Sequence, residues 1–219
     1  AAAVVASNHL VALLGQVELY PALNPLGLDT LRRGVPIYEV DLNRCFPGHA
    51  EGMLPHRVAD AVMRALAGTA LVVDIHASNI YLREIPQVRI AQDFADDLVP
   101  LARRMNLDLI WVPGASTVRE NTIAHSLTAS GVRCLVSEMG GGMRVTPSFA
   151  DQVTIGILHA WRALGVLASD VEIEPATHAP LVAHDGNVHY LNAEVSGLFV
   201  PCAAHWMAAG SNLQRRGSV

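Results

Sequence analysis

Three short strings of this sequence contain side chains that can do chemistry. They are Asp-Leu-Asn-Arg at residues 41–44, Asp-Ile-His at residues 74–76, and Ser-Glu at residues 137–138, just ahead of a run of glycines. An Asn-Arg pair can bind a carboxylate in fork geometry, a histidine at a strand end can hold a metal ion, and a glutamate can move a proton. Together the strings predict the site of a hydrolase. A catalytic zinc ion normally takes three protein ligands, and only His76 has a convincing setting for one.

Glu138 is the strongest single candidate. It follows an apolar run at residues 132–136 that we predict to be a buried strand. Burial disfavours the charged form of a carboxyl group, so this setting predicts a raised pKa that suits proton transfer. The alternative is a carboxylate bound by backbone amides of the glycine turn at residues 140–142, which would lower the pKa. Those glycines lack the Lys-Ser/Thr of a phosphate-binding loop, so they do not predict a nucleotide site.

His76 closes an apolar run, and such a histidine either binds a metal ion or forms a structural hydrogen bond. Asp74 stands two residues earlier, and alternate residues of a strand share a face. Its carboxylate is therefore suited to accept a hydrogen bond from an imidazole N–H and to orient a metal ligand. The other interpretation is that Asp74 caps a turn or lies at the surface.

Asn43 and Arg44 are candidates for binding a substrate carboxylate, and we call them the carboxylate clamp. Most arginines are simply solvated. Arg44, however, lies between Leu42 and the Cys-Phe-Pro string at residues 45–47, so its guanidinium sits beside apolar chain. A charged group in such surroundings needs a partner, and we expect Arg44 to have one.

The segments around these strings alternate between strand-like and helix-like patterns. Short apolar runs predict buried strands at residues 16–23, 70–75, 107–112 and 132–136. Apolar residues at steps of three and four predict helices at residues 1–14, 56–67, 91–105 and 148–167. Such alternation is typical of an α/β sheet covered by helices, and it leaves antiparallel edge strands open. In these sheets ligands bind beyond the carboxyl ends of strands, where His76 and Glu138 fall.

The residue pattern of the sequence changes after Leu167. Short extended pieces at residues 188–191 and 197–200 are separated by glycines and prolines, without a long helical period. We therefore divide the chain into an α/β catalytic domain over residues 1–168 and a small β-rich module over residues 169–219.

Length and composition fit an ordinary enzyme domain. The chain has 219 residues, of which 51% are hydrophobic and 16% charged, and its formal charge of -5 gives no basic footprint for nucleic acid. No apolar run approaches the roughly 20 residues needed to span a bilayer, so we expect no membrane partner. Three widely spaced cysteines indicate neither a disulfide framework nor a CxxC metal site, which favours a cytoplasmic protein. The sequence leaves open whether the protein forms a homo-oligomer.

The order of the motifs resembles the succinylglutamate desuccinylase/aspartoacylase family of zinc-dependent deacylases, which is related to the zinc carboxypeptidases. The resemblance covers about residues 8–200 and rests on the strings at residues 24–27 (NPLG), 41–48 (DLNRCFPG), 73–76 (VDIH) and 137–142 (SEMGGG). It implies a zinc-carboxypeptidase-like α/β fold, with a mixed sheet covered by helices, followed by a small β domain.

Carried over residue by residue, the resemblance implies that His76 is the third ligand of a zinc ion. It also implies that Glu138 is the general base and proton shuttle, and that Asn43 with Arg44 binds the substrate carboxylate. These roles agree with those that the residue types and their settings indicate.

Two parts of the family pattern depart from this chain. The family uses an arginine shortly before the Asp-Leu-Asn-Arg string to stabilise a developing oxyanion; the spacing here leaves Arg32 and Arg33 as candidates, and we favour Arg33. The family's first two zinc ligands come from a His-Gly-Asn/Asp-Glu string, and this chain begins after the place where that string would stand. The resemblance therefore implies an N-terminal truncation and a chain that is inactive as printed.

We predict a zinc-dependent hydrolase, with one Zn²⁺ per subunit, that cleaves the amide bond of an N-acylated amino acid or a similar small carboxylate-bearing substrate. The alternative enzyme is a zinc carboxypeptidase, because the same clamp would grip a peptide C-terminus. The alternative from another class is a non-catalytic carboxylate-binding protein of the same fold. The acyl group and the amine are not encoded in a recognisable string.

Overall fold

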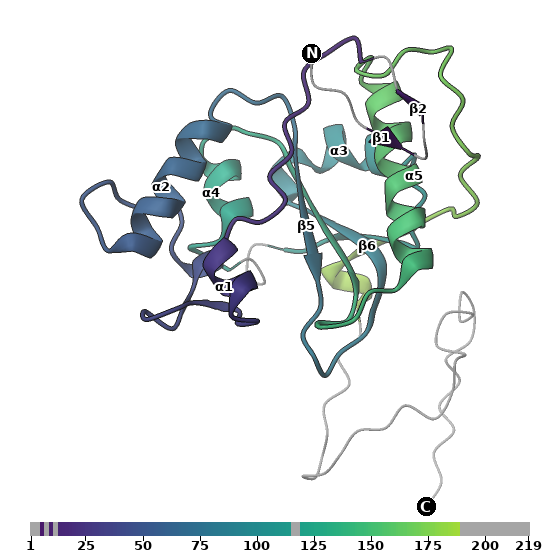
Figure 1. Ribbon diagram of the computed structural model, residues 1–219. Coiled ribbons are helices and arrows are strands. Elements are labelled where there is room, and N and C mark those ends of the chain that lie inside the picture. Colours follow the sequence, from purple (N-terminus) through teal and green to yellow (C-terminus); the bar gives the residue numbers. More distant parts are fainter. Residues whose placement is uncertain (1–4, 7–8, 11–12, 115–118, 189–219) are drawn as a thin grey trace, which may run out of the picture. The chain divides into compact units, whose positions relative to one another are not determined.

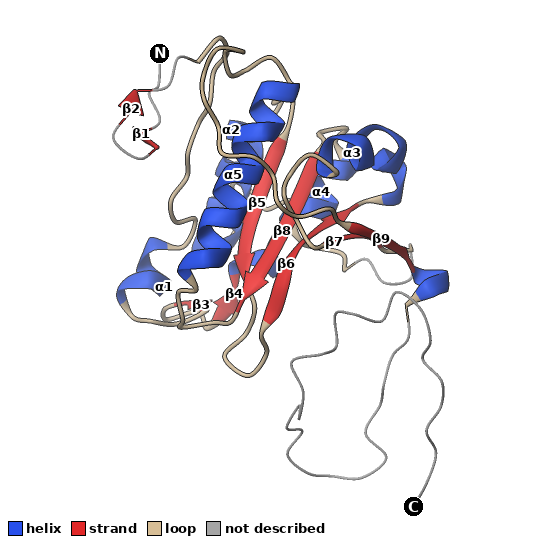
Figure 2. Cartoon of the chain, turned by 90° about the vertical axis from the view of Figure 1, so that its right-hand side faces the viewer, coloured by secondary structure: helices blue, strands red, loops and turns tan. Residues whose placement is uncertain are grey.

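A mixed β-sheet forms the centre of the part of the chain that the computed structural model describes, which is residues 5–6, 9–10, 13–114 and 119–188 (Figure 1). Within these residues the sheet has five strands in the order β5-β8-β6-β7-β9, which Figure 2 shows side by side. Their bounds are Val72–Ala77 for β5, Glu84–Ile90 for β6, Leu109–Val112 for β7, Cys134–Gly140 for β8 and Leu181–His184 for β9.

The strands run in two directions, and the direction changes between β8 and β6. β5 is parallel to β8, β6 is antiparallel to β8, and β7 is parallel to both β6 and β9. The carboxyl ends of β5 and β8 therefore lie at the same edge of the sheet as the amino end of β6. Three segments that are distant in sequence meet at this edge.

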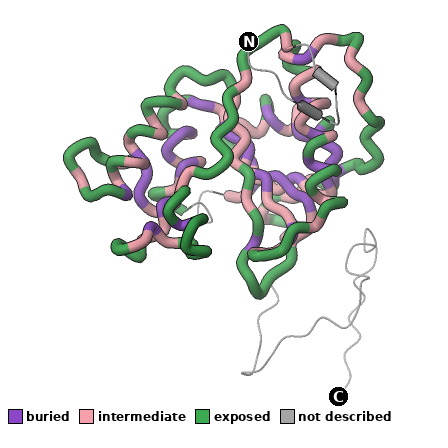
Figure 3. The backbone as a smooth tube through the Cα atoms, viewed as in Figure 1, coloured by how far each residue is buried: buried purple, intermediate pink, exposed green. Residues whose placement is uncertain are grey.

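Helices cover both faces of the sheet, and their inner sides are buried (Figures 1 and 3). On the face of α2 and α4, Ala59 and Leu127 pack with Cys134; on the face of α3 and α5, Leu98 and Val153 pack with Leu135. The α-helices are Pro25–Asp29 (α1), Leu54–Leu66 (α2), Ala95–Ala102 (α3), Ile123–Ala129 (α4) and Pro147–Ala163 (α5), and the 3₁₀ helices are Leu42–Arg44, Gln92–Phe94 and Asp185–Asn187. In the described ranges, no helix is long and apolar enough to cross a membrane.

Strand β8 serves both faces through its alternating side chains. Cys134 and Val136 pack toward α2 and α4, whereas Leu135 and Met139 pack toward α3 and α5. Because side chains of a strand repeat every two residues, Glu138 shares the face of Val136. The candidate site is therefore built on the face that carries α2 and α4.

The predicted mixed α/β sheet covered by helices is confirmed, and the start of the chain is where the prediction was wrong. Residues 16–23 form no strand; a strand needs a hydrogen-bonded neighbour, and the described residues provide none for this largely exposed stretch. The helix predicted over residues 1–14 is absent where that range is described, because Val5–Ala6 (β1) pairs antiparallel with His9–Leu10 (β2). Pairing there overrides the helix propensity of the alanines.

The β-rich module predicted over residues 169–219 is described only in its first part. There, β9 pairs in parallel with β7 and extends the main sheet, and Val182 packs against the cluster on the α3 and α5 face. Residues 189–219 lie outside the described residues. The module and its boundary at residue 168 therefore stay predictions.

Candidate active site

His76 and Glu138 lie side by side at the carboxyl ends of two parallel strands. They are register partners in the pairing of β5 with β8, so their side chains share one face of the sheet. Both side chains are largely buried, with 27% of His76 and 13% of Glu138 exposed. The fold thus places an imidazole beside a carboxyl group where solvent is partly excluded.

Asp74 orients the His76 ring. Asp74 Oδ2 lies 2.7 Å from His76 Nε2, and this hydrogen bond is the main cause that raises the pKa of His76. Burial opposes the shift, the charges of Asp74 and Glu138 add to it, and the charge of Arg33 opposes it. With Nε2 bound to Asp74, Nδ1 is the nitrogen left for a metal ion.

Among the described residues, His76 is suited to bind a metal ion, but a complete set of ligands is not present. A histidine backed by a carboxylate is the usual arrangement of an imidazole ligand, and His76 with Asp74 fits it. In the part of the chain that the structure describes, no group of three or more His, Cys, Asp or Glu side chains is placed to hold a metal ion.

The carboxyl group of Glu138 has a raised pKa. Burial is the main cause, and the charges of Arg89 and His76 oppose it. The charge of Glu84 and a hydrogen bond with it act in the same direction as burial. The upward direction is the one expected for a buried proton-transfer group, and it is opposite to that expected for a carboxylate bound by glycine amides.

Two charged residues of β6 that the sequence did not single out lie close to Glu138. Arg89 Nη1 is 3.3 Å from Glu138 Oε1, and Arg89 Nη2 is 2.9 Å from Glu84 Oε1. The guanidinium of Arg89 lies over the ring of Trp111 on β7, 5.3 Å from its centroid. A signal for this strand was present, because polar and apolar residues alternate over residues 87–90 (QVRI), but a proline directly before them obscures it.

A hairpin and a tight turn position the carboxylate clamp. The strands β3 (Gly34–Val35) and β4 (Val40–Asp41) pair antiparallel and lead directly into the 3₁₀ helix Leu42–Arg44. Asp41 caps this helix, because its Oδ1 accepts a hydrogen bond of 2.9 Å from the backbone N–H of Asn43. The buried side chains around the turn then fix its place on the α2 and α4 face.

Both members of the clamp have partners in the structure. Asn43 Oδ1 accepts a hydrogen bond of 2.9 Å from the backbone N–H of Ile123, the first residue of α4. This bond uses the carbonyl half of the side-chain amide and leaves the NH₂ half as a donor for a carboxylate. Arg44 Nη1 lies 3.9 Å from Asp41 Oδ2, which gives this arginine the partner that its apolar setting called for.

Asp41 also binds Arg33, whose Nη2 lies 3.0 Å from the same Oδ2. Of the two candidate arginines, Arg33 is the one whose charge affects His76, where it lowers the pKa. Arg32 pairs instead with Glu39 at 2.6 Å. The predicted residues therefore form two groups, one on the strand ends and one around Asp41, and Arg33 couples them electrostatically.

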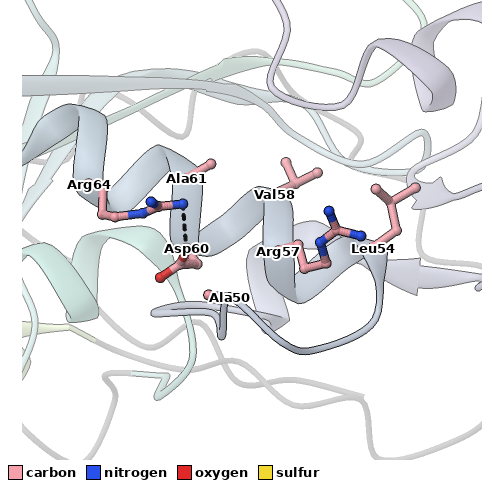
Figure 4. A pocket seen from close by; sticks show the side chains of 7 residues that line it. All are labelled: Ala50, Leu54, Arg57, Val58, Asp60, Ala61 and Arg64. Atoms are coloured by element: carbon pink, nitrogen blue, oxygen red, sulfur yellow. Dashed lines mark ion pairs between the residues drawn. The ribbon is translucent and has the colours of Figure 1, made fainter.

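A hollow of about 220 Å³ adjoins the site, and His76, Met139 and Arg144 are among the residues that line it. A second hollow, of about 320 Å³, lies along α2 and contains none of the predicted site residues (Figure 4). In it, Arg64 Nη2 is already paired with Asp60 Oδ2 at 2.8 Å (Figure 4). Of these two hollows, the first is the one that contains a predicted site residue, His76. Its other lining residues include Met139 and, from α5, Phe149 and Ala150, so it lies mainly on the face of α3 and α5 and not on that of Glu138.

A match to a protein family identifies the class of protein to which this fold belongs. Residues 5–164 match the model of the succinylglutamate desuccinylase/aspartoacylase catalytic domain, a range that includes every predicted site residue. The chain therefore belongs to the succinylglutamate desuccinylase/aspartoacylase family, a family of deacylases.

Individual relatives agree with this assignment. The N-alpha-acetyl-L-2,4-diaminobutyric acid deacetylase of Halomonas elongata is 25% identical over 190 residues, which are 84% of this chain and 55% of the relative. The product-bound ectoine utilization protein EutE (DoeB) of Ruegeria pomeroyi has a TM-score of 0.65 at 22% identity, over 76% of this chain and 51% of that one. A succinylglutamate desuccinylase of Silicibacter sp. TM1040 has a TM-score of 0.66 at 22% identity, over 80% and 53%. The structural likenesses show the fold, and this chain spans about half the length of these relatives.

Proposed function

We propose that this protein is a zinc-dependent deacylase that hydrolyses the amide bond of an N-acylated amino acid or a similar small carboxylate. The observation that carries the proposal is the juxtaposition of His76, bound to Asp74 at 2.7 Å, with Glu138 at the adjacent strand end. Membership in a family of deacylases supports the same reaction class.

The zinc ion would be held by Nδ1 of His76 and by two ligands from outside the described residues. The support is the chemistry of the donors present, since the carboxylate of Asp74 on Nε2 favours metal binding at the other ring nitrogen. When bound, zinc lowers the pKa of a water molecule and polarises the scissile carbonyl.

The side chains of this chain would supply the remaining functions. Glu138 would accept the proton of the attacking water and return it to the nitrogen of the leaving amine, a task that its raised pKa suits. Arg33 would stabilise the negative charge that develops on the amide oxygen. Asn43 and Arg44 would bind the substrate carboxylate through their N–H groups and so fix which bond is cleaved.

The assay that tests the proposal uses the zinc-loaded whole protein. Four substrates are compared: N-α-acetyl-2,4-diaminobutyrate, which appears in the name of the Halomonas elongata relative, N-acetylaspartate, N-succinylglutamate and a peptide with a free C-terminus. Release of the free amino acid that stops on chelation and returns with Zn²⁺ is the expected result. Hydrolysis of the peptide alone would support the carboxypeptidase instead, and carboxylate binding without hydrolysis would support the binding protein.

A further inference from the structure

Arg89 joins the carboxylate of Glu138 to a second carboxylate. Its Nη1 lies 3.3 Å from Glu138 Oε1, and its Nη2 lies 2.9 Å from Glu84 Oε1. These side chains are only 31% (Arg89), 13% (Glu138) and 18% (Glu84) exposed. Partly buried charges are less screened by water than surface pairs, so the guanidinium attracts both carboxylates more strongly than it would at the surface.

The plane of the Arg89 guanidinium is also fixed. It lies over the ring of Trp111, with 5.3 Å between the guanidinium carbon and the ring centroid. Trp111 is the register partner of Arg89 in the β6–β7 pairing, and Gln87 is the register partner of Glu138 in the β6–β8 pairing. Backbone pairing on both sides of β6 therefore holds this group of side chains together.

We propose that Arg89 is a positioning residue that holds the Glu138 carboxylate in the orientation needed for proton transfer. The inference rests on the role of general base that the proposed function gives to Glu138. The ion pair with Arg89 engages Oε1, so we assign the proton transfer to Oε2. A carboxylate without this contact would turn about its last bond and would hold the reactive orientation for only part of the time.

Arginine suits this position better than lysine. A guanidinium offers separate N–H groups to two carboxylates and a flat face to an aromatic ring, whereas an ammonium is a point charge. Glu84 binds Nη2 and so keeps Nη1 directed at Glu138. Lysine at this position would keep the charge and lose most of the orientation.

Crystal structures of variants test the positioning without reference to activity. In Arg89→Met we expect the Glu138 carboxylate to leave its position or to occupy two conformers, and in Arg89→Lys we expect a smaller change. Arg133→Met is the matched control, because Arg133 is 35% exposed, is paired with Asp97 at 2.8 Å and stands at the opposite end of β8 from Glu138. If Arg89→Met does not fold, the lysine variant decides. A Glu138 carboxylate that stays in place would overturn the proposal.

Kinetics of the zinc-loaded whole protein test the consequence. We expect Arg89→Met to lower kcat by about 10–100-fold with KM changed by less than about twofold, and Arg89→Lys to restore part of the loss. In a Glu138→Gln background, Arg89→Met should cause no further loss, because it acts through the group that it positions. An equal loss in both backgrounds would overturn the proposal.

The two inferences can fail separately. A whole protein that binds zinc and hydrolyses none of the substrates would overturn the proposed function. The crystal structures would still show whether Arg89 orients Glu138, with Arg133→Met as the reference.

Discussion

Glu138 is a carboxyl group under opposing influences. Burial raises its pKa, and the positive charges of Arg89 and His76 lower it. A group held between such influences is suited to accept a proton in one step and to donate it in the next. The same contact with Arg89 engages one of its two oxygens, so the chemistry of this residue depends on its neighbours on two strands, β5 and β6.

Replacing Glu138 by glutamine separates this role from a structural one. Glu138→Gln keeps the size of the side chain and removes its proton exchange, so we expect turnover of the zinc-loaded protein to fall by about 10²–10⁴-fold. Zinc content and the circular dichroism spectrum should be unchanged. Glu51→Gln, at an exposed position outside the site, is the control. Loss of zinc or of the fold in Glu138→Gln would mean that Glu138 has a structural role.

Arg44→Lys tests the carboxylate clamp. An ammonium cannot form the two parallel hydrogen bonds that a guanidinium makes with a carboxylate, so we expect kcat/KM for carboxylate-bearing substrates to fall by at least about tenfold. Steady-state kinetics measure the effect, with Arg57→Lys on the exposed side of α2 as the matched control. Unchanged kinetics in Arg44→Lys would exclude the clamp.

Cys134 of strand β8 has a buried thiol, and its reactivity reports whether the sheet stays closed. Burial raises the pKa of the Cys134 thiol well above its ordinary value of 9.0, and the charge of Asp74 acts in the same direction. The folded state therefore keeps a proton that the unfolded state loses above that value. By linkage, the free energy of unfolding falls as the pH rises past it.

A labelling experiment checks this description of Cys134. In a Cys202→Ser variant, we expect Cys134 to resist a maleimide under native conditions and to react fully in denaturant, because only an exposed thiolate is reactive. Peptide mass spectrometry identifies the labelled site. Native labelling at the rate of a free thiol would mean that the strand opens easily.

Helix α5 lies close to the turn before β7 at Gly156. A Cβ atom at this position would overlap the backbone carbonyl of Met105. Helix propensity alone would favour alanine by about 1 kcal/mol, whereas overpacking costs about 1–3 kcal/mol, so we expect a net loss of stability in Gly156→Ala. Urea unfolding measures it, with Gly186→Ala as the control, where a Cβ meets nothing within 4 Å. A gain in stability would mean that α5 shifts freely.

The elements that the sequence predicts well are those whose signal is local. The apolar runs that became β5, β7 and β8 all contribute side chains to the clusters beneath the helices, so their composition alone identifies them. β6 was missed because a proline interrupts its alternation, and α4 was missed because it is only seven residues long. Residues 16–23 have the composition of a strand without a neighbour to pair with among the described residues.

The candidate site divides in the same way. His76, Glu138 and the clamp stand at the ends of short strings, so their types and spacing can be read directly. Arg89 and Glu84 reach Glu138 only because β6 lies antiparallel beside β8, and strand order is a long-range property that no local pattern contains. The roles assigned to all these residues stay predictions until the variants are measured.

The described residues offer the proposed zinc ion fewer ligands than a catalytic site needs. Among these residues, His76 is the one histidine with a convincing setting for zinc, whereas catalytic zinc depends on the combined geometry of three ligands. We therefore expect the 219-residue chain alone to lose zinc on dialysis and to be inactive on N-acylated amino acids. Elemental analysis after dialysis measures the first, and an acyl-release assay the second.

Controls for this prediction come from single histidines in the whole protein. His76→Ala should lower its zinc content, and His159→Ala, whose ring lies 2.9 Å from the backbone carbonyl of Glu174, should not. Stoichiometric zinc in the dialysed 219-residue chain would contradict the prediction. The other ligands would then be sought first at Asp74, His49 and His56.

The hydrogen bond between Asn43 and Ile123 connects the clamp to the backbone of α4. The first amides of a helix have no partner inside the helix and normally exchange their protons with water within a short time. The backbone N–H of Ile123 instead donates to Asn43 Oδ1, and the NH₂ group of the same Asn43 side chain is the one proposed to bind the substrate. Deuterium uptake at this one amide consequently follows the clamp itself, slow when Asn43 is in place and fast when it swings away. The exchange rate of the first amide of α4 therefore reports whether the binding site is formed.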